Sequence, residues 1–282
     1  MKCAWQAYLN ILPHRLRQDV DNLGRAALQE LRLRVGLQPE LILTQGTQRL
    51  NHTITNSDLS FVINVASNYS PWAAATTARG YLTAEGGHRI GMCGACTIKS
   101  GTMTGIQHLR SLCIRVARDF NGISKELYKI NNSILILGPP GSGKTTLLRD
   151  LIRMKSNSGY GNISVVDERE ELFPFEKEKP CFVFGERTDI LSGSSKATGI
   201  NCVLRNMNPE WIAVDEITAE EDCNALLHAG WCGVKLIATA HAGSVEDLLK
   251  RPVYKSIVAE ELFSTAIVMK RDKSWSLERI RK

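Results

Sequence analysis

Residues 133–150 read Ser-Ile-Leu-Ile-Leu-Gly-Pro-Pro-Gly-Ser-Gly-Lys-Thr-Thr-Leu-Leu-Arg-Asp, and this stretch decides the fold of the 282-residue chain. The apolar run at 134–137 predicts a buried strand, and residues 145–154 continue with apolar side chains at helical spacing. The loop between them has the form G-x-x-x-x-G-K-T. The alternative to a phosphate-binding loop is a glycine-rich turn that matches this pattern by chance. However, strand, loop and helix follow one another in the order that a phosphate-binding loop requires.

The loop carries the groups that hold a nucleotide. Its glycines let successive backbone N–H groups turn towards an oxyanion, and the start of the helix adds partial positive charge. We expect Lys144 to reach the β- and γ-phosphates of ATP and the Thr145 hydroxyl to ligate Mg²⁺, which prefers oxygen ligands. The predicted nucleotide-binding residues are Gly138, Pro139, Pro140, Gly141, Ser142, Gly143, Lys144, Thr145 and Thr146.

Two later apolar strands end in acids. The strand at 163–167 runs into the acidic cluster 167–171, and the strand at 211–215 ends in Asp215 and Glu216. Strands alternate with helices here, which predicts a parallel sheet, and such sheets bind ligands at the carboxyl ends of their strands. We therefore expect Asp215 to hold Mg²⁺ directly or through water, and Glu216 to polarise the attacking water as general base.

A third apolar strand, 234–241, ends in a histidine. A lone histidine is usually structural, but at this edge of the sheet His241 could donate a hydrogen bond to the γ-phosphate and report its loss. Arg187 and Arg205 lie between the acidic strands, and Arg251 follows the third strand. Each arginine can pair with an acid or reach a phosphate across a subunit boundary, and the sequence does not rank them.

Composition is that of an ordinary globular protein. The chain is 43% apolar, and no apolar stretch approaches the roughly 20 residues that span a bilayer. The first residues lack the pattern of a signal peptide, so we expect a cytoplasmic protein. Its eight cysteines are scattered as buried free thiols would be. The pair Cys93 and Cys96 leaves open a redox pair or, with His88 and His108, a zinc site.

The net charge of +6 lies entirely in the first part of the chain. Residues 1–120 hold 13 Lys and Arg against 7 Asp and Glu, whereas residues 121–282 hold 22 of each sign. Eleven of those 13 are arginines, whose planar fork suits phosphate and carboxylate groups. A solvated face, a nucleic-acid surface and arginines that reach a neighbour's nucleotide all remain open.

The pattern predicts two domains, an α+β domain over 1–121 and a P-loop domain over 122–282. The join is expected at Asp119–Gly122, followed by a helix at 124–129. The elements expected in the first domain are a helix over 5–16 with a break or new start at Pro13, strands at 40–44 and 49–55, a helix from Ser57 or Asp58 to about Asn68, a small-residue helix through Ala78, hairpin arms at 79–84 and 88–92 around the turn 85–87, and a strand at 111–118.

The motifs G-P-P-G-S-G-K-T-T-L-L-R-D, V-V-D-E-R-E-E, R-N-M-N-P-E-W-I-A-V-D-E-I and I-A-T-A-H-A resemble those of the stage III sporulation protein AA family, within the wider type II and type IV secretion ATPases. Patterns at 79–83, 86–91 and 114–118 extend the resemblance over nearly the whole chain. The resemblance implies a RecA-like ATPase that assembles as a homo-oligomeric ring, a hexamer. It also implies a place at the mother-cell face of the outer forespore membrane, on a membrane-bound channel component similar to SpoIIIAB.

The resemblance also assigns roles to residues. Gly138 to Thr146 correspond to the Walker A box and Asp215-Glu216 to the Walker B box. Asp167, Glu168 and Glu171 stand where relatives carry their acidic "Asp box", and His241 stands in the "His box". In those relatives an acid of the Asp box can serve as the base, which leaves Glu216, Glu168 and Asp167 as alternatives. Thr218, where glycine is expected, and Glu170, where a small residue is usual, depart from the family pattern.

The resulting hypothesis is a Mg²⁺-dependent ATPase that drives the channel between mother cell and forespore. An arginine from the N-terminal domain of the same or an adjacent chain, Arg89, Arg115 or Arg118, would offset charge on the transferring phosphoryl group. The alternatives are a nucleic-acid translocase or remodelling ATPase, disfavoured by the absence of an aromatic-interleaved basic stripe, and a binding-only switch for assembly.

Overall fold

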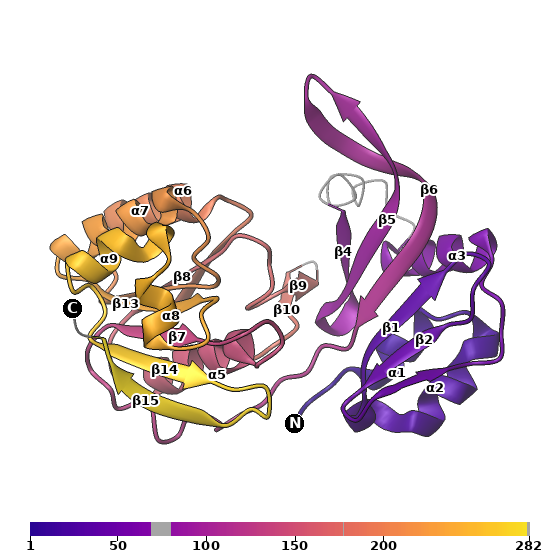
Figure 1. Ribbon diagram of the computed structural model, residues 1–282, viewed down its shortest axis with the longest axis horizontal. Coiled ribbons are helices and arrows are strands. Elements are labelled where there is room, and N and C mark those ends of the chain that lie inside the picture. The colour runs from indigo at the N-terminus through magenta and orange to yellow at the C-terminus, as the bar shows by residue number, and fades with distance from the viewer. Residues whose placement is uncertain (69–79, 177, 281–282) are drawn as a thin grey trace. The chain divides into compact units, whose positions relative to one another are not determined.

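The computed structural model describes residues 1–68, 80–176 and 178–280, and their elements are labelled in Figure 1. The chain forms two compact units. Unit 1 comprises Met1–Asp119 and Phe175–Phe182, and unit 2 comprises Phe120–Pro174 and Val183–Lys282. Among the described residues, no helix combines the length and the apolar character that a membrane crossing requires.

Unit 1 is built on a six-stranded antiparallel sheet of order β3-β2-β1-β6-β5-β4. Its strands are β1 (Leu28–Arg34), β2 (Glu40–Leu43), β3 (Thr47–Arg49), β4 (Tyr81–Ala84), β5 (His88–Lys99) and β6 (Thr102–Arg115). Its helices are α1 (Trp5–Asn10), α2 (His14–Ala27), α3 (Asn56–Ala66) and the short 3-10 helix η2 (Glu85–Gly87), and unit 1 also holds the two-stranded hairpin of β9 (Phe175–Glu176) and β10 (Lys179–Pro180).

The core of unit 1 lies between its helices and one face of this sheet. Leu12, Leu16 and Val20 of the N-terminal segment are fully buried in one cluster with Leu31 and Ile114 of the sheet. Pro13 precedes the first residue of α2, as expected of a residue that has a fixed φ and no N–H to donate. The new helical start and the hairpin of β4 and β5 around residues 85–87 are therefore confirmed.

Several expected boundaries in unit 1 were wrong. The second of the two early strands is Thr47–Arg49, and α3 is capped by Thr55, whose hydroxyl accepts from the Asp58 N–H while the Asp58 carboxylate accepts from the Thr55 N–H. The strand expected at 111–118 begins at Thr102, because its first half pairs only with the polar end of β5 and so lacks a buried apolar pattern. Strand β1 was not expected, and the helix expected through Ala78 lies outside the described residues.

Unit 2 contains a seven-stranded sheet of order β11-β8-β12-β13-β7-β14-β15. All neighbours run parallel except β15, which is antiparallel to β14. The strands are β7 (Ile134–Leu137), β8 (Ile163–Asp167), β11 (Thr188–Ser192), β12 (Trp211–Val214), β13 (Lys235–Ala240), β14 (Thr265–Met269) and β15 (Trp275–Arg279). The expected strands at 134–137, 163–167, 211–215 and 234–241 are confirmed.

Helices cover this sheet. They are α5 (Lys144–Asn157), α6 (Lys196–Asn206), α7 (Glu220–Trp231), α8 (Val245–Leu249), the 3-10 helix η3 (Pro252–Tyr254) and α9 (Lys255–Ala259). The predicted helix after the phosphate loop is confirmed as α5. Residues of α6, α7 and α9 share one apolar cluster with alternate residues of β7, β12 and β13, as expected for a strand that presents side chains to both faces.

The helix expected at 124–129 is absent, and this segment forms turns. The start of this segment is held by the buried carboxylate of Asp150, which accepts hydrogen bonds from the backbone N–H of Gly122 at 2.9 Å and of Ser124 at 2.8 Å. Asp150 in turn pairs with Arg153 at 2.8 Å, so the entry of the chain into unit 2 is tied to α5 rather than to a helix of its own.

Candidate nucleotide site

The phosphate loop lies between β7 and α5 and is shaped by glycine. Gly143 precedes α5 with φ of 100°, a conformation that side chains with a Cβ avoid. Gly138 has φ of 155°, and a Cβ there would lie 2.6 Å from Ser142 Oγ and 2.8 Å from the Met269 carbonyl oxygen. The backbone of the loop therefore has the form that its sequence predicts, and it needs glycine at both positions.

The buried hydroxyl of Ser142 accepts and donates no hydrogen bond within the described residues. An unsatisfied buried hydroxyl costs about 1–3 kcal/mol, so it normally has a partner. Since the hydroxyl sits in the loop between β7 and the start of α5, an oxygen of a bound phosphate would supply that partner. The loop thus fits a nucleotide.

Lys144 is folded back onto the loop. Its Nζ donates to the carbonyl oxygens of Gly138 at 2.9 Å and Pro139 at 3.1 Å, and it lies 3.1 Å from His241 Nδ1. Burial lowers the pKa of Lys144, and the nearby charges of Asp215 and Glu216 oppose part of that shift. The ammonium group is thus already in the loop and has weak neutral partners that a phosphate oxygen can replace.

Thr145, Asp215 and Thr239 form a connected set of oxygen donors and acceptors. The Thr145 hydroxyl lies 2.7 Å from one carboxylate oxygen of Asp215, and the Thr239 hydroxyl lies 2.6 Å from the other. Thr239 also accepts from the backbone N–H of Glu216 at 2.8 Å. The two predicted Mg²⁺ ligands are therefore side by side, and their all-oxygen chemistry fits that ion.

Glu216 is held by two basic side chains. One carboxylate oxygen lies 2.8 Å from His241 Nε2, and the other lies 3.7 Å from an Arg169 nitrogen. Glu216 also has a φ of 57°, which is uncommon for a residue with a side chain. Because strained backbone of this kind clusters at functional sites, the conformation supports a role for its carboxylate.

The two acids at the end of β8 lie in different environments. Asp167 is 3% exposed, and its carboxylate accepts from the backbone N–H groups of Glu171 at 2.9 Å, Leu172 at 3.0 Å and Phe173 at 2.9 Å. Burial raises the pKa of Asp167 to about 6, although these three hydrogen bonds favour the charged form. All of its resolved contacts hold the loop, so Asp167 has the environment of a structural acid.

Glu168 lines the same cleft as Asp167, Asp215 and Glu216. Its carboxylate pairs with the Lys196 ammonium group, which is almost fully buried at the start of α6. A buried cation beside a partly exposed carboxylate fixes the position of that carboxylate. Glu168 therefore remains beside Glu216 as an acid of this cleft.

The other candidate residues have structural partners or lie elsewhere. In unit 1 the Arg118 guanidinium donates to the Arg25 and Leu28 carbonyl oxygens, the Arg89 guanidinium stacks 4.1 Å from the Tyr81 ring centre, and Arg115 lies 3.5 Å from a Glu30 oxygen. In unit 2, Arg251 pairs with Asp247 at 2.9 Å.

Arg187 and Arg205 precede β11 and β12. They therefore lie at the amino edge of the sheet, which does not bring them to the phosphate loop of their own unit. Cys93 and Cys96 are exposed free thiols on β5, and within the described residues no group of three or more His, Cys, Asp or Glu side chains could hold a metal ion.

Three site residues were missed by the sequence analysis: Arg169, Lys196 and Thr239. Arg169 lies inside the acidic cluster, where a basic residue was a signal that we did not use. Lys196 and Thr239 have no local signal, because their places at the site come from the pairing of β11 with β8 and of β12 with β13.

Comparison with known families then decides the identity. The profile of the family described as "Sporulation stage III, protein AA" matches residues 4–279. The chain belongs to the sporulation stage III, protein AA family. The stage III sporulation protein AA of Bacillus subtilis (strain 168) is 38% identical over 277 residues, which is 93% of this chain and 90% of the relative.

Solved structures of other proteins share the fold of this member of the sporulation stage III, protein AA family. The pilus retraction motor PilT with bound ADP matches with a TM-score of 0.60 at 15% identity, over 89% of this chain and 76% of that chain. The ATPase DotB of Legionella pneumophila matches with a TM-score of 0.56 at 17% identity, over 93% and 78%. The likeness confirms the expected RecA-like α/β fold of the secretion ATPases with an N-terminal antiparallel-sheet domain.

Proposed function

We propose that this chain is a Mg²⁺-dependent ATPase that converts ATP and water to ADP and phosphate. The main support for the proposal is that three features lie together at the carboxyl edge of one sheet, where its parallel strands end. These are the glycine-shaped loop with Lys144, the Thr145–Asp215 pair, and the Glu216 carboxylate beside His241. The loop with Lys144 can bind phosphate, the Thr145–Asp215 pair can bind the metal, and the Glu216 carboxylate can activate water.

Binding begins with an exchange of partners in the loop. Lys144 leaves the carbonyl oxygens of Gly138 and Pro139 for phosphate oxygens, and the Ser142 hydroxyl gains the partner that it lacks. Thr145 and Asp215 would hold Mg²⁺, which when bound would supply positive charge to the transferring phosphoryl group. Because the loop is preformed, little ordering accompanies nucleotide binding.

Glu216 is our choice of general base, and Glu168 is the alternative. The carboxylate of Glu216 is oriented by His241 and Arg169, whereas that of Glu168 is already paired with the almost fully buried Lys196. In this proposal Asp167 holds the loop 168–173 in place through its hydrogen bonds to the backbone. His241 contacts Glu216 and senses the γ-phosphate of the bound nucleotide.

We extend the proposal to a motor. Membership of the family supports a role in sporulation, and the secretion-ATPase fold supports a hexameric ring. The ring would lie in the cytoplasm at the mother-cell face of the outer forespore membrane and drive a channel component similar to SpoIIIAB. Arg115, whose side chain is 62% exposed, is the arginine of unit 1 best placed to reach a neighbour's nucleotide, ahead of Arg89 and Arg118. Arg187 and Arg205 would act only across a subunit boundary.

A nucleic-acid translocase has less support. Its basis is the +6 charge of residues 1–120, but part of that charge is already paired with acids. Four arginines of unit 1 pair with carboxylates: Arg15 with Asp58, Arg32 and Arg115 with Glu30, and Arg34 with Glu40. Paired guanidinium groups are poorly available to a phosphate backbone.

The test is phosphate release from ATP with Mg²⁺ or with chelator, in the absence and presence of single-stranded DNA or RNA. The proposal predicts turnover that requires Mg²⁺, is lost in Lys144→Ala, and does not respond to nucleic acid. Turnover stimulated by nucleic acid and suppressed by salt would favour the translocase, and ATP binding without turnover would favour the binding-only switch.

A further inference from the structure

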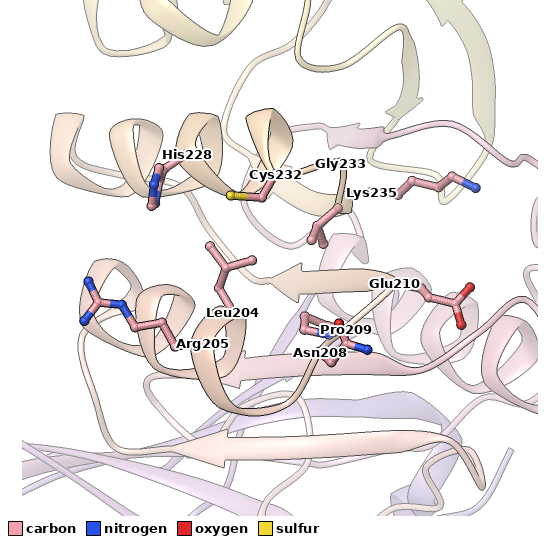
Figure 2. Close-up of a pocket in the computed structure, with 10 residues that line it drawn as sticks. Leu204, Arg205, Asn208, Pro209, Glu210, His228, Cys232, Gly233 and Lys235 are labelled. Atoms are coloured by element: carbon pink, nitrogen blue, oxygen red, sulfur yellow. The ribbon is translucent and has the colours of Figure 1, made fainter.

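The amino edge of the sheet in unit 2 carries a groove of about 560 Å³, opposite to the nucleotide site. The groove lies between the C-terminal ends of α6 and α7 and the residues that lead into β12 and β13 (Figure 2). Leu204, Pro209 and Val234 give it an apolar lining. An apolar hollow at the ends of two helices is a place where a side chain of another molecule can insert.

Charge is distributed unevenly along this groove. Figure 2 shows Arg205 and His228 at one end, on the last turns of α6 and α7, and Glu210 and Lys235 pointing away at the other. Lys235 donates to Asn131 Oδ1 at 2.9 Å, and a Cβ at Gly161 would lie 2.3 Å from a Glu210 carboxylate oxygen. Among the described residues, the side chains of Arg205, His228 and Glu210, unlike that of Lys235, have no hydrogen-bond or ion-pair partner.

Two large apolar side chains stand close to the groove in sequence. Trp231 is 69% exposed and immediately precedes Cys232 of the lining, and Met207 is 42% exposed and immediately precedes Asn208. Tryptophan, methionine and arginine are the residue types enriched in protein interfaces. A cation near a helix end and a single exposed apolar residue are each common alone, but here Arg205 lines the hollow and Trp231 and Met207 adjoin its lining residues in sequence.

The exposure and the charge of the groove indicate which kind of molecule it binds. Most lining residues are exposed, including Asn208, Cys232 and Gly233, so a small molecule would keep much of its surface in water, unlike ligands in typical binding pockets. The N-terminal unit of a second copy is also disfavoured, because residues 1–120 carry the whole +6 charge of the chain and would approach Arg205 with like charge.

We propose that this groove binds a short segment of a different protein, one that presents a carboxylate to Arg205 and His228 and an apolar side chain to the lining at Leu204 and Val234. The groove precedes β12 and β13 and the phosphate loop follows β7, a parallel strand of the same sheet, so the two lie at opposite edges and the segment can stay docked while nucleotide enters and leaves. The inference does not depend on hydrolysis, since docking is measured without nucleotide.

The test uses three short fluorescent peptides and the full chain. The first peptide alternates Glu and Leu, the second has Lys in place of Glu, and the third has Ser in place of Leu. Fluorescence anisotropy at low salt is expected to show binding of the first peptide and at least about tenfold weaker binding of the other two. Arg205→Glu and Trp231→Ser should each weaken binding of the first peptide about tenfold or more.

Lys250→Glu is the matched control, because it reverses one charge at the C-terminal end of α8, outside the groove. It should bind the first peptide like the wild type. Thermal unfolding checks that each variant is folded, and Arg205→Gln replaces Arg205→Glu if the reversal unfolds the chain. Equal binding of all three peptides, unchanged binding by the Arg205 variant, or a change of its oligomeric state in sedimentation would each overturn the proposal, the last by showing a contact between copies.

Discussion

The two edges of the sheet in unit 2 differ in how their polar side chains are used. At the carboxyl edge the charged groups are linked to one another, as in the series Lys144, His241, Glu216 and Arg169. At the amino edge Arg205 and His228 lack partners within the described part of the chain and border an apolar groove. The two edges are the opposite ends of one set of parallel strands. The difference in how their charged side chains are paired therefore arises from the loops and helix ends and not from the sheet.

This difference indicates two kinds of binding. Linked groups are already oriented, and a preorganised set of charges is what stabilises a phosphoryl group in reaction. The unpaired Arg205 guanidinium at the border of an apolar hollow can pair with a carboxylate of a molecule outside the chain. The carboxyl edge is therefore assigned to chemistry and the amino edge to docking, and the following predictions test that division.

The largest effect is expected for Glu216→Gln. If its carboxylate is the base, hydrolysis should fall by about a hundredfold to ten-thousandfold while ATP binding persists, because the phosphate loop is unchanged. Phosphate release and fluorescent-nucleotide binding measure the two properties. Glu186→Gln makes the same change on an exposed residue just before β11, at the amino edge, and should leave both unaltered. Near-normal turnover in Glu216→Gln, with loss in Glu168→Gln, would move the role to Glu168.

Asp167 is expected to make folding depend on pH. Its pKa is raised to about 6 by burial, from 3.8, so the folded chain binds the proton more tightly than the unfolded chain. Stability from this group is thus present below pH 4 and is lost as the pH rises through 6, by about 3 kcal/mol. Urea unfolding from pH 4 to 7 should show that loss in the wild type relative to Asp167→Asn. A free energy of unfolding of the wild type, minus that of Asp167→Asn, that stays constant or rises with pH would contradict it.

Lys196→Met should have a smaller effect on turnover. Removing the ammonium group frees the Glu168 carboxylate to move in the cleft, and misplacement of one such group costs about tenfold in kcat. Lys196→Arg keeps the charge and should recover most of the activity. If Lys196 only stabilised the fold, both variants would melt earlier and kcat per folded chain would not change.

The smallest effect is expected for Arg169→Ala. Its side chain is 57% exposed and lies 3.7 Å from Glu216, and exposed pairs contribute about 0.2–1 kcal/mol. Turnover should fall by no more than about fivefold, and the fall should diminish at high salt because screening already weakens the pair. A larger loss that salt does not alter would instead indicate direct contact of Arg169 with nucleotide.

The parts of the site that could be predicted from the sequence are those encoded locally. The loop 138–145 and the acids after 214 are contiguous with the strands that place them, so strand, turn and side chain appear in one motif. Lys196 could not be found this way. It meets Glu168 only because Ser192 of β11 pairs with Asp167 of β8, a register set by the whole sheet.

The fold shows the same limit. The alternating pattern of unit 2 predicted its parallel sheet, but the first half of β6 carries polar residues and glycine and pairs only with β5. The segment 124–129 forms turns although propensity alone favoured a helix, and its first residue is held by Asp150, a residue of another element. Each miss lies where a distant side chain or strand, rather than the local sequence, satisfies the backbone.

The central claim is that the carboxyl edge hydrolyses ATP and is completed by a neighbouring chain in a ring. It is tested most directly by the rate of ATP hydrolysis per chain, with Mg²⁺, over a wide range of protein concentration. The account predicts a specific rate that climbs with concentration and levels off when rings have formed. A rate that is appreciable and independent of concentration, or no turnover at any concentration, would contradict it.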